Sequence, residues 1–417
     1  MADPAEPPDA TGPADATAGP AGATVPGWKR IFVLVCASTI GTFIAHGLLY
    51  PTLPLYLTDQ LGTTKATAGL VVSSMSLSAI VVRPFAGNFV DRFGRRPLLI
   101  AGPLLMVLSA VGLLTLRSVT AVLVFRLIQG AGSALAYSGA SPVVADVAPV
   151  HRRASMLALY SLFFYIGIAV GPFLAELLIS EVGYRSVWWA VGAFTSTGFV
   201  LALFVPETGV RTGVRSTLSF RHRVFHPSTT RPGIVWLCIG TGWAAVASFL
   251  SLYARDIGLD SSDMLFLVLA LTVMATRFFA GGLADTRGRL QVAIPSVALL
   301  VAGITVLAAL RTPTFAVVGL ILFGMGFSGA FPALFAMVVD EAPEAERGTA
   351  MSSFNLYYDL GAPVGGYGVG MLVDRGGFGL GFGAVAALAA LGFLLLPILN
   401  RPAARPVPAP RESPLSG

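Results

Sequence analysis

Long apolar runs alternate with short polar connections along most of the chain. Each run has about 20 residues or more, the length that a helix needs to cross the hydrocarbon core of a bilayer. The runs are continuous, without the strict alternation of a membrane-spanning strand, so they predict helices and exclude a β-barrel. We expect twelve spanning helices, at residues 31–57, 66–90, 98–116, 120–145, 156–179, 187–205, 233–253, 264–284, 292–310, 315–339, 350–373 and 380–399.

The helices fall into two groups of six, which predicts an all-α membrane protein built from two six-helix bundles. The terminal segments are rich in Pro and Ala, and the first has no apolar run that would make it a signal peptide. We expect a disordered tail at 1–27, a first bundle at 28–205, a cytoplasmic linker at 206–232, a second bundle at 233–400 and a disordered tail at 401–417.

Composition agrees with a membrane protein. The chain of 417 residues is 55% hydrophobic and 12% charged, whereas soluble domains carry about 25% charged residues. Its two cysteines, Cys36 and Cys238, lie inside apolar runs. We expect both to be core residues, so neither a disulfide framework nor a thiolate metal site is indicated.

The formal net charge of +6 raises the question of a nucleic-acid partner, and the placement of the basic residues decides it. Eighteen Lys and Arg residues lie in the connections on one side of the membrane and six on the other. Cytoplasmic loops carry the positive excess, so both termini and the linker are predicted to be cytoplasmic in a multi-pass inner-membrane protein. We therefore expect no nucleic-acid partner, and interpret the linker's Arg and His residues as orientation signals and lipid head-group contacts.

An internal repeat relates the two bundles. A shift of 194 residues places Arg83 on Arg277, Asp146 on Asp340, and the glycines and acids of matching loops on one another. Matches in separate helix pairs at one offset indicate a duplicated six-helix unit. Such a duplication predicts a substrate site between the halves, near the membrane midplane, that is exposed alternately to each side.

The loop after the second helix resembles the G-x-x-x-D-R-x-G-R-R signature of the major facilitator superfamily. In that family the loop forms an ionic latch with an acid at the end of the fourth helix and with the N-terminus of the eleventh. The alternative is a positive-inside signal alone. In the second copy Thr286 replaces the first arginine, which implies a weaker latch. The matching latch residues are Gly87, Asp91, Arg92, Gly94, Arg95 and Asp146, with Asp285 and Arg289 in the second half.

Three shorter elements resemble the twelve-helix drug and metabolite antiporters of the same family. Arg126-Leu-Ile-Gln129-Gly130 is similar to an R-x-x-Q-G element that the family associates with proton coupling. Residues 167–176 are similar to the antiporter element G-x-x-x-G-P-x-x-G-G, but Ala175 and Glu176 replace its last two glycines, which weakens the inference of antiport. Residues 51–54 match a short P-x-x-P element.

Asp359 is the strongest candidate for a titrating group in the cavity. It lies about ten residues into the eleventh helix, near the bilayer centre, and shares a helix face with Asn355. An intramembrane acid binds protons, pairs with a cationic substrate, or serves as a fixed partner of Arg126. Arg126 in turn either faces the cavity or is held by backbone carbonyls or an acid.

Other polar and aromatic side chains within the helices complete the candidate site. His46 titrates or is a satisfied structural histidine, and Glu176 faces the cavity or is solvated near the outer end of its helix. The aromatic residues line the substrate cavity or are packing and interface anchors. The substrate-cavity candidates are Tyr50, Gln129, Tyr137, Phe164, Tyr165, Trp243, Asn355 and Tyr358.

Sequence motifs also limit the energy source. Neither lysine of the chain follows a glycine as in a P-loop, and no catalytic triad or metal-ligand cluster is recognisable. We therefore expect no enzyme activity, cofactor or metal, and a monomer that draws on an ion gradient. The favoured function is proton-coupled export of a small amphipathic drug or metabolite. Proton-coupled uptake is the alternative, and a non-transporting membrane sensor is a further one.

Overall fold

The computed structural model describes residues 27–115, 118–149, 152–208, 219–280, 287–343 and 346–399, and within these ranges the chain is helical without strands. The helices of the N-terminal half are α1 (Trp28–Asp59), α2 (Lys65–Phe93), α3 (Arg96–Thr115), α4 (Val119–Val147), α5 (Arg153–Glu181) and α6 (Tyr184–Leu203). The linker contains α7 (Phe220–Val224) and η2 (Pro227–Thr229). The C-terminal half comprises α8 (Thr230–Asp256), α9 (Asp263–Ala280), α11 (Arg289–Ala309), α12 (Pro313–Glu341), α13 (Arg347–Pro363), η4 (Val364–Gly368) and α14 (Val369–Leu399).

The expected twelve spanning helices are confirmed. Ten segments of the described chain are long and apolar enough to cross a membrane. One of them, Arg347–Pro397, is interrupted by non-helical backbone at Gly376 and Gly377 and therefore consists of two helices. The apolar helix α9 is the twelfth. Gly377 has φ of 74°, a left-handed conformation that glycine adopts without steric cost, so the chain turns there.

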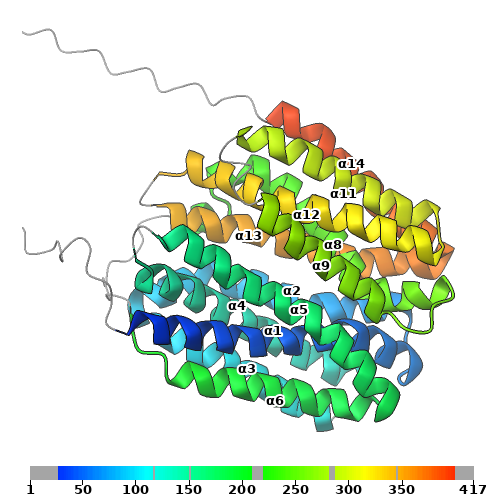
Figure 1. Ribbon diagram of the computed structural model, residues 1–417, viewed down its shortest axis with the longest axis horizontal. Helices are drawn as coiled ribbons and strands as arrows, with labels where there is room; N and C mark the ends of the chain where they lie inside the picture. The colour runs from blue at the N-terminus through cyan, green and yellow to red at the C-terminus, as the bar shows by residue number, and fades with distance from the viewer. Residues whose placement is uncertain are drawn as a thin grey trace, which may run out of the picture.

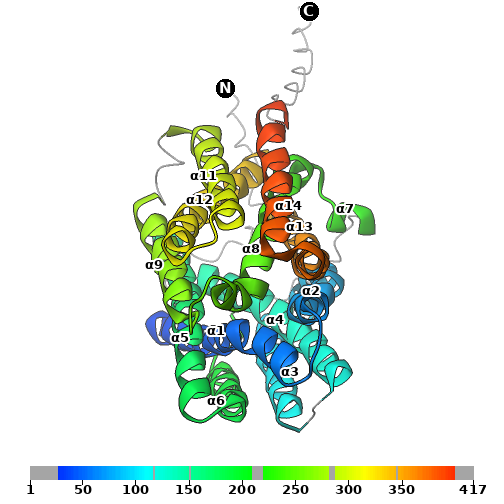
Figure 2. The same ribbon diagram turned by 90° about the vertical axis from the view of Figure 1, so that its right-hand side faces the viewer.

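The two halves lie side by side with their helices roughly along the long axis of the molecule (Figure 1). Seen along that axis, α2 lies beside α13 and α14, and α5 lies beside α9 (Figure 2), so these helices form the boundary between the halves. Helix α1 begins and α14 ends toward the same side of the molecule (Figure 1). We call the end where α1 begins the near end and the end where α1 finishes, at Asp59, the far end.

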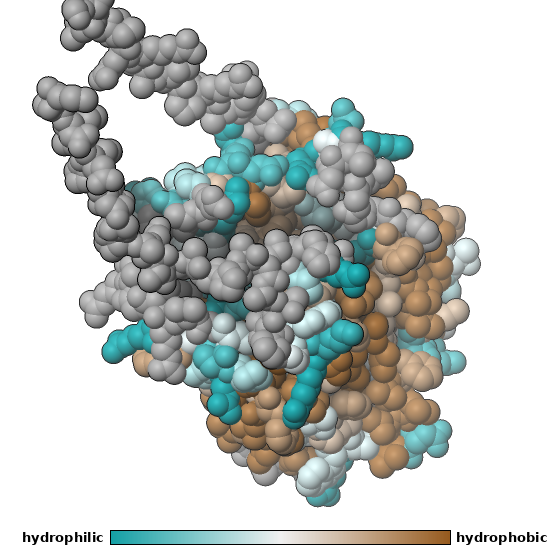
Figure 3. Space-filling view, turned by 60° about the vertical axis from the view of Figure 1, so that its left-hand side comes forward, coloured by the Kyte–Doolittle hydropathy of each residue, from teal (hydrophilic) through white to brown (hydrophobic). Residues whose placement is uncertain are grey.

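Apolar side chains cover the flank of the bundle (Figure 3). Large hydrophobic residues that are exposed in the described structure include Val81, Leu394 and Phe278, the last of which is 76% exposed. Exposed apolar surface of this extent is unfavourable in water, whereas it is expected in contact with lipid tails.

Glycines let the helices of each half approach closely. Gly167 and Gly171 of α5 lie against the backbone of α1, where a Cβ atom would collide with residues near Gly47. The equivalent glycines of α13, Gly361 and Gly365, lie in the same way against α8, next to Thr241. Small residues permit this close approach of the helices, and the matching positions show the 194-residue repeat in a further helix pair.

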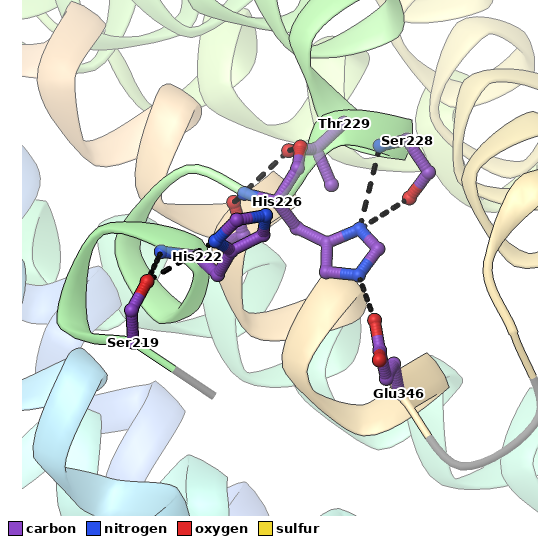
Figure 4. A network of polar contacts seen from close by, with 7 residues as sticks. Ser219, His222, His226, Ser228, Thr229 and Glu346 are labelled. Atoms are coloured by element: carbon purple, nitrogen blue, oxygen red, sulfur yellow. Dashed lines mark hydrogen bonds and ion pairs between the residues drawn. The ribbon is translucent and has the colours of Figure 1, made fainter. Parts of the chain in front are cut away.

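The linker is tied to the C-terminal half through a buried histidine (Figure 4). The His226 side chain is 3% exposed. Its Nε2 lies 2.9 Å from Oε2 of Glu346, its Nδ1 lies 2.8 Å from Oγ of Ser228, and its backbone N–H donates to Oγ of Ser353. The expectation that the linker histidines contact lipid head groups is therefore wrong for His226, because packing against α13 buries it.

Candidate functional site

An ion pair between a partly buried arginine and a buried carboxylate joins the two halves. The guanidinium of Arg83, on α2, donates from Nε to Oδ2 of Asp359, on α13. The side chains are 17% and 5% exposed. Moving a carboxylate out of water costs far less when a cation remains beside it. Asp359 therefore has an opposite charge supplied by the other half of the molecule, and that partner is Arg83 rather than Arg126.

A second intramembrane arginine at the boundary has no acidic partner among the described residues. Arg277, on α9, places its Cζ atom 4.6 Å from the ring centroid of Tyr165, on α5, and 5.2 Å from that of Phe331, on α12. Its Nε and Nη2 atoms are buried and make no hydrogen bond within the described structure. Cation–π contact thus replaces an ion pair at this position.

The environments of the two arginines are related by the repeat. Arg83 and Arg277 are 194 residues apart, and so are Tyr137 and Phe331, whose rings lie near the respective guanidinium groups. The same offset relates Tyr165 to Asp359. The two clusters therefore differ in charge for one reason: Arg83 has a carboxylate beside it, whereas Arg277 has a phenol.

An apolar cavity adjoins Arg277 between the halves. Tyr165 lines this cavity and also stacks over Arg277, and Val273 lines it one helical turn before Arg277 on α9. Tyr50 of α1 and Trp243 of α8 line it as well. The full lining comprises Tyr50, Tyr165, Ile168, Trp243, Val246, Ala247, Phe266, Leu269, Ala270 and Val273. In this conformation the cavity has room for about one water molecule, and Arg277 lies beside it rather than in its lining.

Aromatic stacking in the C-terminal half holds the remaining cavity candidates. The ring of Trp236 lies 5.4 Å from that of Tyr358 and 5.5 Å from that of Phe354. Trp243 stacks on Phe327 at 4.4 Å. Asn355 donates to its own helix, at the carbonyl of Met351. Tyr358 and Asn355 therefore have packing or local partners in this conformation, and Tyr358 packs beside the core.

Arg126 and Gln129 form a polar cluster inside the N-terminal half. The Arg126 side chain is almost fully buried and donates to Oε1 of Gln129 at 2.6 Å and to the carbonyl of Val72 at 2.7 Å. A third, longer bond reaches the carbonyl of Val71. These contacts correspond to the backbone-held alternative for Arg126 in this conformation.

His46 is buried in α1, with one ring nitrogen satisfied. Its Nδ1 lies 2.9 Å from the carbonyl oxygen of Thr42, while Nε2 is buried without a partner among the described residues. The ring packs against Phe43, and Tyr50, one turn further on, lines the cavity.

Glu176 lies at the far end, where it joins the halves. Its Oε1 accepts from Oγ of Ser262 at 2.5 Å and from the backbone N–H of the same residue. Two further contacts cross the boundary at this end. Arg255 donates to Asp59 at 2.8 Å, and Asp374 accepts the N-terminal N–H groups of α2 at 2.9 and 3.0 Å. These contacts join the two halves at the far end.

The latch motif is organised around Asp146 at the near end. Arg95 Nε lies 2.9 Å from Asp146 Oδ2, and Thr208 also donates to this carboxylate. Glu207 accepts the N–H groups of Arg95 and Arg96 at the start of α3, where a carboxylate is favoured by the helix dipole. Gly94 has φ of 88°, a left-handed conformation that favours glycine, and a Cβ atom there would displace the Glu207 carboxylate.

The remaining latch candidates are described only in part. Arg92 is exposed and lies over the ring of Phe93. Asp285 lies outside the described residues, and so does the side chain of Asp91; for Gly87 only its place within α2 is described. In the second half, Arg289 pairs with Asp340 at 3.2 Å, which repeats the Arg95 and Asp146 pair.

Sequence reasoning did not place Arg83, Arg277, Glu207 or Asp374 in the site. The signal for the arginines was present, because both lie within spanning helices and match each other in the repeat. Glu207 and Asp374 carried no such signal, since acids near helix ends are common.

Comparison with known proteins settles the family. The model of the Major Facilitator Superfamily matches residues 35–366. The chain belongs to this superfamily. It is a multi-pass membrane transporter, and members of the family are transporters rather than enzymes.

Individual proteins that are similar to this chain are also MFS-type transporters. The uncharacterised MFS-type transporter YhhS of Escherichia coli K12 is 24% identical over 87% of this chain and 91% of the relative. An uncharacterised MFS-type transporter of Burkholderia pseudomallei is 28% identical over 90% of this chain and 91% of the relative. Two solved structures share the fold, each covering 89% of this chain and all of the other: the human organic anion transporter MFSD10 (TM-score 0.69, 20% identity) and the nucleoside transporter NupG (TM-score 0.74, 13% identity).

Proposed function

We propose that this transporter exports a small amphipathic molecule in exchange for protons, and that Asp359 is the group that binds the proton. The observation that carries the proposal is the Arg83–Asp359 pair between the halves. Protonation removes the negative charge and leaves Arg83 without its counter-ion, which weakens the contact between α2 and α13. A proton therefore changes the relative stability of the conformations, as coupling requires.

The contacts that join the halves at the far end are consistent with one stage of such a transport cycle. With both termini in the cytoplasm, as the charge asymmetry of the connections favours, the closed far end is the outer end. The deprotonated, paired Asp359 then corresponds to a state that has released its proton inward and is ready to accept substrate. One proton moving through 100 mV supplies about 2.3 kcal/mol, enough for roughly a fiftyfold substrate gradient.

Transport into inverted membrane vesicles tests the direction. Acidifying the lumen should drive accumulation of an amphipathic probe, for which we choose labelled ethidium as a cation and labelled 1-naphthalenesulfonate as an anion. The sulfonate is permanently charged, so the pH gradient does not redistribute it passively. An uncoupler should abolish the accumulation, and Asp359→Asn should prevent it.

Asp256→Asn is the matched control, because this acid pairs at 3.6 Å with Arg311 away from the boundary. It should transport normally. Uptake driven by external acid into right-side-out vesicles, with no uptake into inverted vesicles, would show that the protein is a proton symporter rather than an exporter. Transport that is normal in Asp359→Asn would exclude this residue from the proton pathway.

A further inference from the structure

Arg277 presents hydrogen-bond donors that the described protein does not use. Two of its nitrogens, Nε and Nη2, are buried without a partner. An unpaired buried donor is destabilising, and a buried charge more so, which is why native structures rarely retain them without a reason. A ligand that accepts these hydrogen bonds is one such reason.

The neighbouring rings hold the guanidinium in an orientation suited to an anion. Tyr165 and Phe331 lie within 4.6 and 5.2 Å of Cζ. Aromatic contact restrains the planar group, and its Nε and Nη2 edge, which has no partner among the described residues, matches the two oxygens of a carboxylate or sulfonate.

The position of Arg277 relative to the cavity indicates the rest of the ligand. The wall formed by α9 runs from Phe266 through Ala270 to Val273 and ends one turn before Arg277. Tyr165 belongs to both the cavity wall and the arginine cluster. When the halves separate and this cavity widens, a molecule with an anionic group at Arg277 would place its apolar body among Tyr50, Trp243 and the aliphatic lining.

The repeat supplies an independent argument. At the equivalent position in the other cluster, the protein itself provides the carboxylate, Asp359, that neutralises Arg83. Tyr165 occupies the corresponding position beside Arg277 and provides no charge. No acid among the described residues pairs with Arg277, which leaves its counter-ion to be supplied by a ligand.

We infer that Arg277 binds the anionic group of the transported substrate, so that the substrate class is an amphipathic organic anion with an aromatic or aliphatic body. This inference rests on the proposed function in one respect, the identification of the ligand as the transported molecule. Binding itself requires neither export nor proton coupling.

Ligand binding to the purified full-length protein in neutral detergent tests the inference. The probes are two anions, 1-naphthoate and 1-naphthalenesulfonate, each compared with its neutral amide, 1-naphthamide or 1-naphthalenesulfonamide. Each anion should raise the melting temperature more than its amide does. In Arg277→Gln the affinity for the anions should fall roughly thirtyfold or more, since a charge-paired hydrogen-bonded partner is lost, whereas the amides should change little.

A second readout separates ligand binding from a structural role. Because its buried nitrogens lack partners, Arg277→Gln should not lower the melting temperature of the ligand-free protein, and we expect a rise. Arg311→Gln, which alters an exposed arginine, should leave both binding and stability unchanged. Arg277→Lys keeps the charge without the planar edge and should retain part of the affinity.

Several outcomes would overturn the inference. The inference fails if the wild type binds neither anion, or if it binds each anion and its amide equally. It also fails if Arg277→Gln binds the anions as tightly as the wild type does. A large loss of stability in ligand-free Arg277→Gln would assign the residue to folding instead. Anion binding in a protein that lacks acid-driven transport would leave this inference standing and remove the proposed coupling.

Discussion

Arg83 and Arg277 occupy the same position of a duplicated unit, yet their surroundings differ in charge. Arg83 is paired with Asp359 across the boundary, whereas Arg277 lies between Tyr165 and Phe331. Because Tyr165 is the repeat equivalent of Asp359, one substitution separates a neutral cluster from a positively charged one. The comparison indicates that duplication placed a cation at each side of the boundary and that divergence gave the two cations different surroundings.

The largest expected effect comes from removing one member of the neutral cluster. Arg83→Gln leaves the Asp359 carboxylate buried without its cation, which should lower stability by about 3–5 kcal/mol. Arg83→Gln combined with Asp359→Asn leaves no unpaired charge and should recover most of the loss. Thermal unfolding in neutral detergent measures both variants. Equal melting temperatures of the single variant and the wild type would show that the pair contributes no net stability.

A transplanted acid should convert the charged cluster into a neutral one. Tyr165→Asp places a carboxylate where the repeat has Asp359 in the other half. It should neutralise Arg277 and weaken binding of 1-naphthalenesulfonate by about tenfold or more, because an internal anion then competes with the ligand. Tyr165→Asn has nearly the same shape without the charge and controls for loss of the ring. If both variants bind the sulfonate equally, the charge of Arg277 is irrelevant to recognition.

Much of the fold was predictable because lipid imposes a strong constraint on sequence. A spanning helix must be long and apolar, and the twelve expected segments correspond to helices of the structure. The repeat offset followed from loop residues such as Gly94 and Gly288, both with positive φ.

The partners within the site were less predictable. Asp359 stood out as an intramembrane acid, but its partner lies 276 positions away in the sequence, and helix periodicity does not indicate which helices of different halves meet. The role of Glu207 at the start of α3 depends on the path of the chain after α6. Local sequence patterns therefore identify charged residues that are costly to place in a membrane, whereas tertiary packing determines which of them form pairs.

The smallest effect is expected at the far end, where the ties between the halves are more exposed. Arg255 and Asp59 are 46% and 33% exposed, and such pairs contribute about 0–1 kcal/mol. Arg255→Gln should therefore shift the balance between closed and open far ends by at most about fivefold. Labelling of a cysteine introduced on the boundary near this end would report the shift. Arg185→Gln, an exposed arginine of the same end, should give unchanged labelling, and an equal change in both would indicate a general charge effect.

The central claim is that Asp359 couples transport to protons while Arg277 binds the substrate. Proteoliposomes loaded with unlabelled 1-naphthalenesulfonate allow two measurements on the same preparation. Without a pH gradient, uptake of labelled sulfonate reports exchange. With a pH gradient imposed, it reports gradient-driven transport. We predict that Asp359→Asn keeps exchange and loses gradient-driven uptake, whereas Arg277→Gln loses both. Gradient-driven uptake by Asp359→Asn at the wild-type rate, or normal exchange by Arg277→Gln, would contradict this division of roles.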